Sequence, residues 1–165
     1  MTDFKNAFGT AGTFTVTNAN IASSATAGWM GNVFDNSTSL FQDLEITVEL
    51  AAVNTAPANS QAIFMFVSPS LQDSSGSFTG TGAASIAGTE GTVTFPDITS
   101  KAILVPLLGV IPYSTQNVAI VSPTFSVVKA LGFMPTRIVP AMLNYSGMTL
   151  SVTAIRYRGI YGTGL

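Results

Sequence analysis

The sequence contains no cysteine and no histidine, and only 8% of its 165 residues are charged. Without cysteine no disulfide can form, and without either residue the usual ligands of structural zinc are missing. Six cations against eight acidic residues leave a net charge of −2, so the chain lacks the basic footprint of a nucleic-acid-binding protein. We therefore expect a fold that is held together by packing alone, or by packing and subunit contacts, with no nucleic-acid partner.

Long hydrophobic runs are also missing. The longest apolar stretch, residues 102–113, is interrupted by Pro106, Gly109 and Pro112, and it is shorter than the roughly 20 residues that cross a bilayer. The amino terminus does not resemble a secretory signal, because Asp3 interrupts the positive region and no apolar core follows. We therefore expect no membrane partner and synthesis in the cytoplasm.

What the chain does contain is typical of β-structure. Hydrophobic residues make up 47% of the sequence, and Thr and Val are frequent. These residues are favoured in strands because their branched side chains lose freedom in a helix. Residues 43–53 alternate apolar and polar side chains and predict a half-buried strand. The continuous apolar run at 61–68 predicts a central strand covered on both faces, and we expect these two strands to form a hairpin.

The second half of the chain predicts further strands that are punctuated by proline. Residues 102–108 read as a buried strand bent at Pro106, and residues 117–128 as a strand interrupted at Pro123. The segments 136–143 and 148–161 predict a closing pair of strands. Two features of that pair stand out in the sequence: a turn at Asn144–Gly147, and an apolar parity shift near Ala154 and Ile155 that predicts a β-bulge.

We count about eight strands and no convincing amphipathic helix, which predicts an all-β, antiparallel β-sandwich of jelly-roll type. The polar stretch 70–91 reads as an exposed loop. Residues 1–40 predict an amino-terminal strand or arm that packs on the sandwich or on a neighbouring subunit. Residues 41–165 are then the jelly-roll sandwich itself.

We find no pattern that predicts catalysis or the binding of a metal or cofactor. Asp43, Glu45 and Glu49 share one strand face at roughly the carboxylate spacing of an inverting glycosidase, but a solvated face leaves nothing to raise a pKa. The loops 35–38 and 73–77 carry one carboxylate each, which favours Asx turns over calcium sites. We therefore expect no catalytic residue, no metal, no cofactor and no enzyme activity.

The candidate interface residues are aromatic or cationic. Trp29 and Met30, flanked by glycines, suggest an apolar anchor, with a core position as the alternative. Two arginines point to one side of the last strand, where they would meet Glu45 and Glu49 within the sheet or carboxylates on a neighbouring protein, or would simply solubilise that face. The full candidate set is Trp29, Met30, Arg137, Arg156, Tyr157 and Arg158.

From residue 43 onward, the order of segments resembles the jelly-roll capsid decoration proteins of tailed bacteriophages, which cement and stabilise the head. The segments that carry the resemblance are the apolar strand Ala62–Val67, the Gly- and Ser-rich loop 71–91, the strand Ile103–Ile111, the strand Val121–Phe125, the step at Pro135, the turn Asn144–Gly147 and the closing Arg156–Tyr161.

This resemblance implies a structural virion protein on the outer surface of an icosahedral head, made in the host cytoplasm. Its expected partners are the major capsid protein and further copies of itself, as a dimer or trimer. Binding would bridge adjacent capsid subunits. The alternative is a tail-associated or receptor-binding β-sandwich that recognises cell-surface carbohydrate, for which Trp29 and Tyr113 are the available stacking residues.

Overall fold

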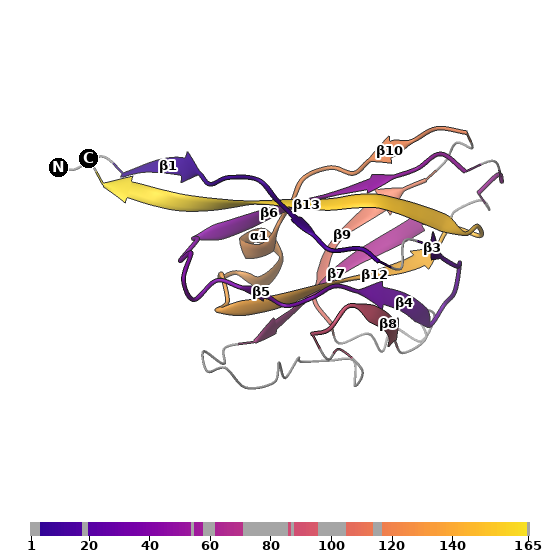
Figure 1. The fold of residues 1–165 in the computed structure, drawn as a ribbon, viewed down its shortest axis with the longest axis horizontal. Helices are drawn as coiled ribbons and strands as arrows, with labels where there is room; N and C mark the ends of the chain where they lie inside the picture. Colours follow the sequence, from indigo (N-terminus) through magenta and orange to yellow (C-terminus); the bar gives the residue numbers. More distant parts are fainter. Residues whose placement is uncertain are drawn as a thin grey trace.

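The computed structural model describes residues 4–17, 20–53, 55–57, 62–70, 86, 88–95, 105–113 and 117–164. In this part of the chain, two antiparallel sheets pack face to face, and one of the connections between them contains a short helix (Figure 1). The predicted all-β sandwich is therefore confirmed.

The first sheet is built around the last strand of the chain. Its members are β1 (Phe4–Phe8), β2 (Gly12–Phe14), β3 (Asn20–Ile21), β6 (Asp43–Leu50), β10 (Ile120–Val121), β11 (Phe125–Ser126) and β13 (Leu150–Gly164). β13 pairs with β1, β2 and β3 along one edge and with β6 along the other, and β6 also pairs with β10 and β11. The β13–β6 register shifts between Val152 and Ala154, which confirms the predicted bulge.

The second sheet is built around the strand that precedes the closing turn. Its members are β4 (Ala27–Met30), β5 (Phe34–Asp35), β7 (Ala62–Ser70), β8 (Gly91–Thr94), β9 (Leu107–Pro112) and β12 (Arg137–Tyr145). The strand order is β8-β4-β12-β7-β9, and β5 also pairs with β12. β7 is central, between β12 and β9, as the continuous apolar run predicts.

The connectivity is that of a jelly roll. In three places, short consecutive strands pair with the same neighbouring strand and together fill one strand position of the sheet. They are β1–β3 along β13, β4–β5 along β12 and β10–β11 along β6. The first sheet then has four positions, β1–β3, β13, β6 and β10–β11, and the second has four, β4–β5, β12, β7 and β9, with β8 added at one edge. These are the eight strand positions of a double-sheet jelly roll.

Two predicted pairings are wrong. β6 and β7 do not form a hairpin, because β6 belongs to the first sheet and β7 to the second. The closing segments β12 and β13 are likewise in different sheets. In both cases the chain crosses to the other sheet instead of reversing within one sheet. Side-chain alternation indicates which face of a strand is buried, but it does not indicate which strand lies beside it.

The predicted strand at 117–128 is also wrong in part. It consists of the two short strands β10 and β11 followed by the helix α1 (Val127–Leu131). The side-chain oxygen of Ser126 caps this helix by accepting a hydrogen bond from the Lys129 amide. Asp43 binds the same end, because its carboxylate accepts from the Ser126 hydroxyl at 2.6 Å and from the Val128 amide at 2.9 Å. The helix ends at Gly132, whose φ is +81°.

The described part of residues 1–40 belongs to the sandwich. It supplies β1, β2 and β3 to the first sheet and β4 and β5 to the second. Phe14, Ile21 and Trp29 from this segment are buried in the main core. Of the two predicted placements, the structure shows packing within the same chain, and the sandwich does not begin at residue 41.

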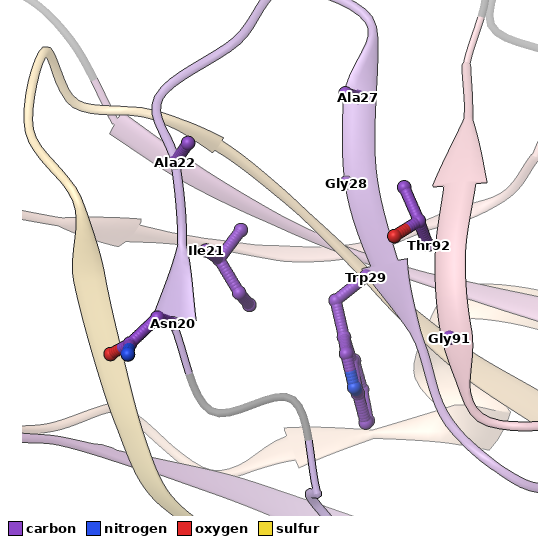
Figure 2. A pocket seen from close by; sticks show the side chains of 8 residues that line it. All are labelled: Asn20, Ile21, Ala22, Ala27, Gly28, Trp29, Gly91 and Thr92. Atoms are coloured by element: carbon purple, nitrogen blue, oxygen red, sulfur yellow. The ribbon is translucent and has the colours of Figure 1, made fainter.

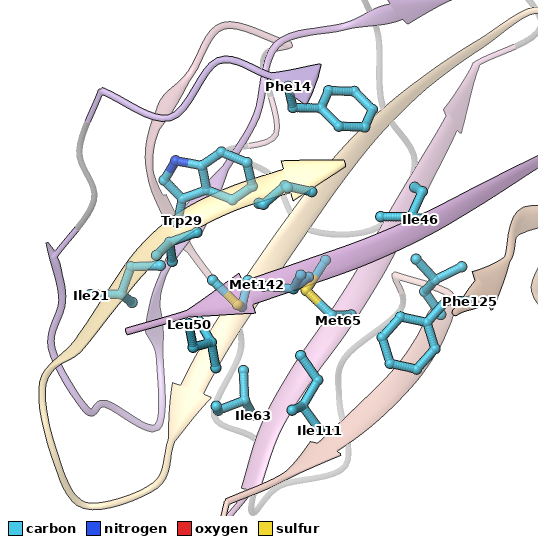
Figure 3. Packing of buried hydrophobic residues seen from close by; sticks show 14 of the residues in the cluster. Phe14, Ile21, Trp29, Ile46, Leu50, Ile63, Met65, Ile111, Phe125 and Met142 are labelled. Atoms are coloured by element: carbon cyan, nitrogen blue, oxygen red, sulfur yellow. The ribbon is translucent and has the colours of Figure 1, made fainter. Parts of the chain in front are cut away.

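The main core lies between the two sheets (Figure 3). From the first sheet, the alternating residues Leu44, Ile46, Val48 and Leu50 of β6 are all 0–1% exposed. They pack with residues from the second sheet such as Ile63, Met65 and Met142. The alternation in the sequence of β6 therefore marks the face that meets the second sheet.

A second apolar cluster covers the outer face of the second sheet. Phe66 of β7 and Val139 of β12 lie in it, together with Phe95 and Val105 from the segments that flank β8 and β9. The rings of Phe66 and Phe95 have centroids 5.0 Å apart. β7 is thus buried on both faces, which confirms the expectation from its unbroken apolar sequence.

The turn that follows β12 is held by a buried amide. Asn144 is 0% exposed, and its amide nitrogen donates to the carbonyls of Ile21 at 2.8 Å and Met148 at 2.6 Å. Its amide oxygen accepts from the backbone and the hydroxyl of Ser146. Gly147 completes the turn at φ +85°. A buried polar side chain costs stability unless it is hydrogen-bonded in this way.

We predict that Gly28→Ala destabilises the fold by about 2 kcal/mol or more, because a Cβ on this residue would lie 2.3 Å from the backbone oxygen of Met142. Gly91→Ala on the adjacent strand β8 is the matched control, since a Cβ there meets no atom within 4 Å. Urea unfolding of both variants gives the two free energies. Equal stabilities would contradict the tight contact between β4 and β12.

Candidate functional site

The predicted arginines lie on the outer face of the first sheet and bind carboxylates of the same chain. Arg158 is directly opposite Glu45 in the β13–β6 register, and their side chains meet at 3.1 Å. Arg156 contacts both carboxylate oxygens of Glu49, at 2.5 and 3.2 Å. The structure therefore realises the in-sheet alternative of the sequence prediction.

These pairs influence the ionisation of their members. The hydrogen bond from Arg156 lowers the pKa of Glu49, and Glu49 in turn raises the pKa of Arg156. A general acid needs a carboxyl pKa shifted in the opposite direction. The two ion pairs on this face join β6 and β13. We call their four residues the charge ladder: Glu45, Glu49, Arg156 and Arg158.

An aromatic side chain extends the charge ladder toward the amino terminus. The guanidinium carbon of Arg158 lies 4.1 Å from the ring centroid of Phe8, which is 55% exposed. This cation–π contact leaves one face of an aromatic ring open to a partner. A shallow hollow of about 170 Å³ adjoins the ladder, lined by Ala11, Glu45, Thr47, Thr124, Arg156, Tyr157 and Arg158.

Tyr157 lies on the opposite side of β13 from the two arginines. Its ring packs in an aromatic cluster, with centroids 4.9 Å from Phe14 and 5.0 Å from Phe34. Gly12 makes room for it, because a Cβ on that residue would lie 2.3 Å from the tyrosine ring. Tyr157 is therefore a packing residue at the margin of the core, and the interface role predicted for it stays a prediction.

Arg137 is apart from the other predicted arginines, on β12 in the second sheet. It binds Asp35 of β5 at 3.1 Å. A hydrogen bond with Ser37, aided by Arg137, lowers the pKa of Asp35. The Ser37 amide donates to the Asp35 carboxylate at 2.8 Å, which is the Asx turn predicted for this loop. The other predicted Asx loop, at 73–77, lies outside the described residues.

The prediction that Trp29 and Met30 form an interface anchor is wrong for this chain. Trp29 is 2% exposed in the main core, and Met30 is 7% exposed in the outer cluster. Their flanking glycines serve close packing, since a Cβ on Gly31 would lie 2.8 Å from the Trp29 ring. The indole nitrogen donates to Glu90 at 3.2 Å, and the same carboxylate accepts from the backbone and hydroxyl of Thr17.

A hollow of about 200 Å³ lies beside Trp29, between β3 and the β4–β8 pair (Figure 2). Its wall is formed by Asn20, Ile21, Ala22, Ala27, Gly28, Trp29, Gly91 and Thr92. Sugar recognition commonly uses an exposed aromatic face, but both residues proposed for stacking are buried: Tyr113 is 3% exposed and Trp29 2%. This hollow therefore lacks the stacking surface that the carbohydrate alternative predicts.

Among the described residues, no three Asp, Glu, Cys or His side chains come together as metal ligands would. In the same part of the chain, no helix is long and apolar enough to cross a bilayer. Neither observation identifies a reaction or a ligand.

The surface feature that sequence reasoning missed is a set of exposed apolar side chains at strand edges and ends. Leu107 and Val110 of β9 are 48% and 40% exposed. Leu107 lies in the segment 102–108 that the sequence predicts as buried, so that prediction is wrong for Leu107, whereas Val105 and Leu108 of the same segment are buried and residues 102–104 lie outside the described residues. A groove of about 450 Å³ runs from β9 to the helix. The exposed large apolar residues described are Phe8, Leu40, Leu107, Val110, Val118, Val121, Phe133 and Tyr161.

Comparisons with known proteins add only a distant likeness. No protein-family model matches the chain, and no curated protein matches it. Among solved structures, a basic winged bean lectin crystallised with Tn-antigen aligns over 98% of this chain and 100% of its own, with 8% identity and a TM-score of 0.36. A likeness at this level carries no argument about function.

We predict that the Arg156–Glu49 pair stabilises the fold at neutral pH and not in acid. The folded-state pKa of Glu49 is lowered, so its contribution is complete above the ordinary glutamate pKa and is lost as the pH falls through the lowered value. Glu49→Gln should therefore lower the melting temperature near pH 7 but not near pH 2, and high salt should reduce the difference. A deficit that is equal at both pH values would contradict this assignment.

Proposed function

We propose that this chain is a structural virion protein that binds the outside of an icosahedral phage head as a small homo-oligomer and cements adjacent major capsid subunits. The observation that carries the proposal concerns the surface. The residues of the charge ladder form ion pairs within the chain, while large apolar side chains remain exposed on strands and at strand ends. The resemblance of its segment order to decoration proteins supports the same reading.

The paired charges matter because they leave a nearly neutral surface. Glu45 and Glu49 are compensated by arginines on the same sheet, so a partner need not supply opposite charge at this face. Apolar side chains and hydroxyl groups then provide the contact. Such a surface suits a large, fixed protein lattice better than a charged small molecule.

The stabilising effect follows from linkage. A protein that binds only the assembled lattice stabilises it by RT ln(1 + [L]/Kd) at each site. An oligomer that contacts several capsid subunits binds with higher avidity than one copy does. Modest apolar contacts, repeated over the head, are then sufficient to resist internal pressure.

One patch that fits this role is the exposed edge of the second sheet, which we call the β9 patch: Leu107 and Val110, with Phe64 beside them on β7. Phe64 is opposite Val110 in the register, so the two side chains share the outer face of the sheet. The patch is continuous with the outer apolar cluster, to which Phe64 contributes.

The test is binding of the purified chain to expanded heads that lack it, assembled from the major capsid protein of the same phage. We expect co-sedimentation that saturates at a fixed ratio to the capsid subunit, and heads that resist heat better when saturated. Leu107→Ser with Val110→Ser should weaken binding, whereas Val121→Ser, on the first sheet, should not. Failure of the unaltered chain to bind expanded heads would overturn the proposal.

A further inference from the structure

β1 and the end of β13 form a two-stranded ribbon that extends from one end of the sandwich, with Phe4 and Gly164 as its outermost described pair (Figure 1). The pairing of β13 with β6 stops at Ile160 and Asp43, whereas its pairing with β1 continues to Gly164. Within the described chain, the ribbon beyond that point therefore has two strands only. A two-stranded ribbon on its own is marginally stable in water, so a third strand would stabilise it.

The backbone hydrogen bonds show which groups of β1 face outward. The Gly9 amide donates to the Gly159 carbonyl at 2.8 Å, so this residue directs its backbone groups toward β13. Successive residues of a strand direct theirs to opposite edges. Phe8, Asn6 and Phe4 therefore direct their N–H and C=O groups to the other edge, where no described strand pairs with β1.

Three other described edge strands, β9, β10 and β11, carry features that discourage pairing with a second chain. β9 follows Pro106, ends in Pro112 and has a register shift. β10 and β11 have two residues each, with Pro123 between them. Proline, lysine, short strands and bulges are the usual protection of an edge. β1 has five residues, one of which is Lys5, and neither a proline nor a described bulge.

We propose that β1 pairs antiparallel with β1 of a second copy of this chain, across a twofold axis at Asn6. In this register Asn6 is opposite Asn6 of the second copy, and Phe4 is opposite Phe8. All outward-facing backbone groups of both strands then form hydrogen bonds, and the two first sheets become one continuous sheet. A twofold axis requires this kind of self-complementary edge.

Neighbouring registers are less favourable for reasons of hydrogen bonding and charge. A shift that places the axis at residue 5 or 7 lets only two of the three outward-facing residues of β1 pair with β1 of the other copy. The shift to residue 5 also places Lys5 of one copy opposite Lys5 of the other, and like charges directly across a pair are destabilising. The axis at Asn6 instead places Lys5 opposite Ala7.

The exposed aromatic residues of the ribbon agree with an edge contact. Phe8 is 55% exposed on one face of the ribbon, and Tyr161 is 37% exposed on the other. They are on opposite faces because Phe8 is paired with Ile160, the residue that precedes Tyr161. A second ribbon alongside would extend both faces and cover part of each ring. This inference concerns the purified chain and holds whatever particle the chain binds.

Sedimentation equilibrium of the purified chain measures the association directly. We expect a dimer, and Asn6→Pro should weaken it roughly tenfold or more because the central pair of hydrogen bonds is lost. The Asn6 amide does not face β13, so this proline removes no hydrogen bond within the chain, and an unchanged unfolding transition should confirm that the fold is retained.

Cross-linking locates the axis. The chain has no cysteine of its own, so Asn6→Cys introduces a single thiol. Directly opposite residues in this register have Cα atoms about 5.5 Å apart, within the range that a disulfide bridges. Mild oxidation should therefore give a covalent dimer, while the matched control Ala7→Cys, which is opposite residue 5, should not.

A monomer at all concentrations, a trimer, or a dimer that Asn6→Pro leaves unchanged would each overturn the proposal. Cross-linking through residue 7 in place of residue 6 would do the same. If the dimer forms as described and the chain does not bind phage heads, the inference stands and the proposed function fails.

Discussion

The contact between the two sheets is the constraint on which the rest of the structure depends. The chain has no cysteine and therefore no disulfide, and the inward residues of β6, such as Ile46 and Leu50, hold the layers together by burial. Each fully buried side chain of this kind contributes about 1.5–3 kcal/mol. Gly28 shows how closely the strands lie, because the backbone of β12 occupies the space of a Cβ.

Two of the connections between the sheets are fixed by hydrogen bonds between the backbone and a buried or half-buried side chain. Asn144 binds the turn between β12 and β13, and Asp43 binds the start of the helix that precedes β12. The charged groups of the first sheet also find their partners within the chain, since the charge ladder of Glu45, Glu49, Arg156 and Arg158 forms its ion pairs within this one sheet. The consequence is a neutral surface on which apolar edges are the remaining features available for association.

The sequence predicted the fold class, the strands β6 and β7 and the bulge in β13, because side-chain alternation reports burial directly. The pairing of Arg156 and Arg158 with Glu49 and Glu45 was one of the alternatives that it left open. It did not predict which sheet receives each strand, because a crossing and a hairpin can share the same turn residues. It also left Trp29 open between an interface anchor and a core position, because the partner of the buried indole, Glu90, is distant in sequence. The open edge of β1 depends on long-range pairing with β13, which no local pattern contains.

The most direct test of the central claim, that this chain is a head decoration protein, is its copy number in purified virions relative to the major capsid protein, measured by quantitative mass spectrometry. The account predicts a copy number comparable to that of the capsid subunit, because each lattice position offers the same contact. A handful of copies per particle would contradict the account and would place the chain at the tail, with host recognition as its role.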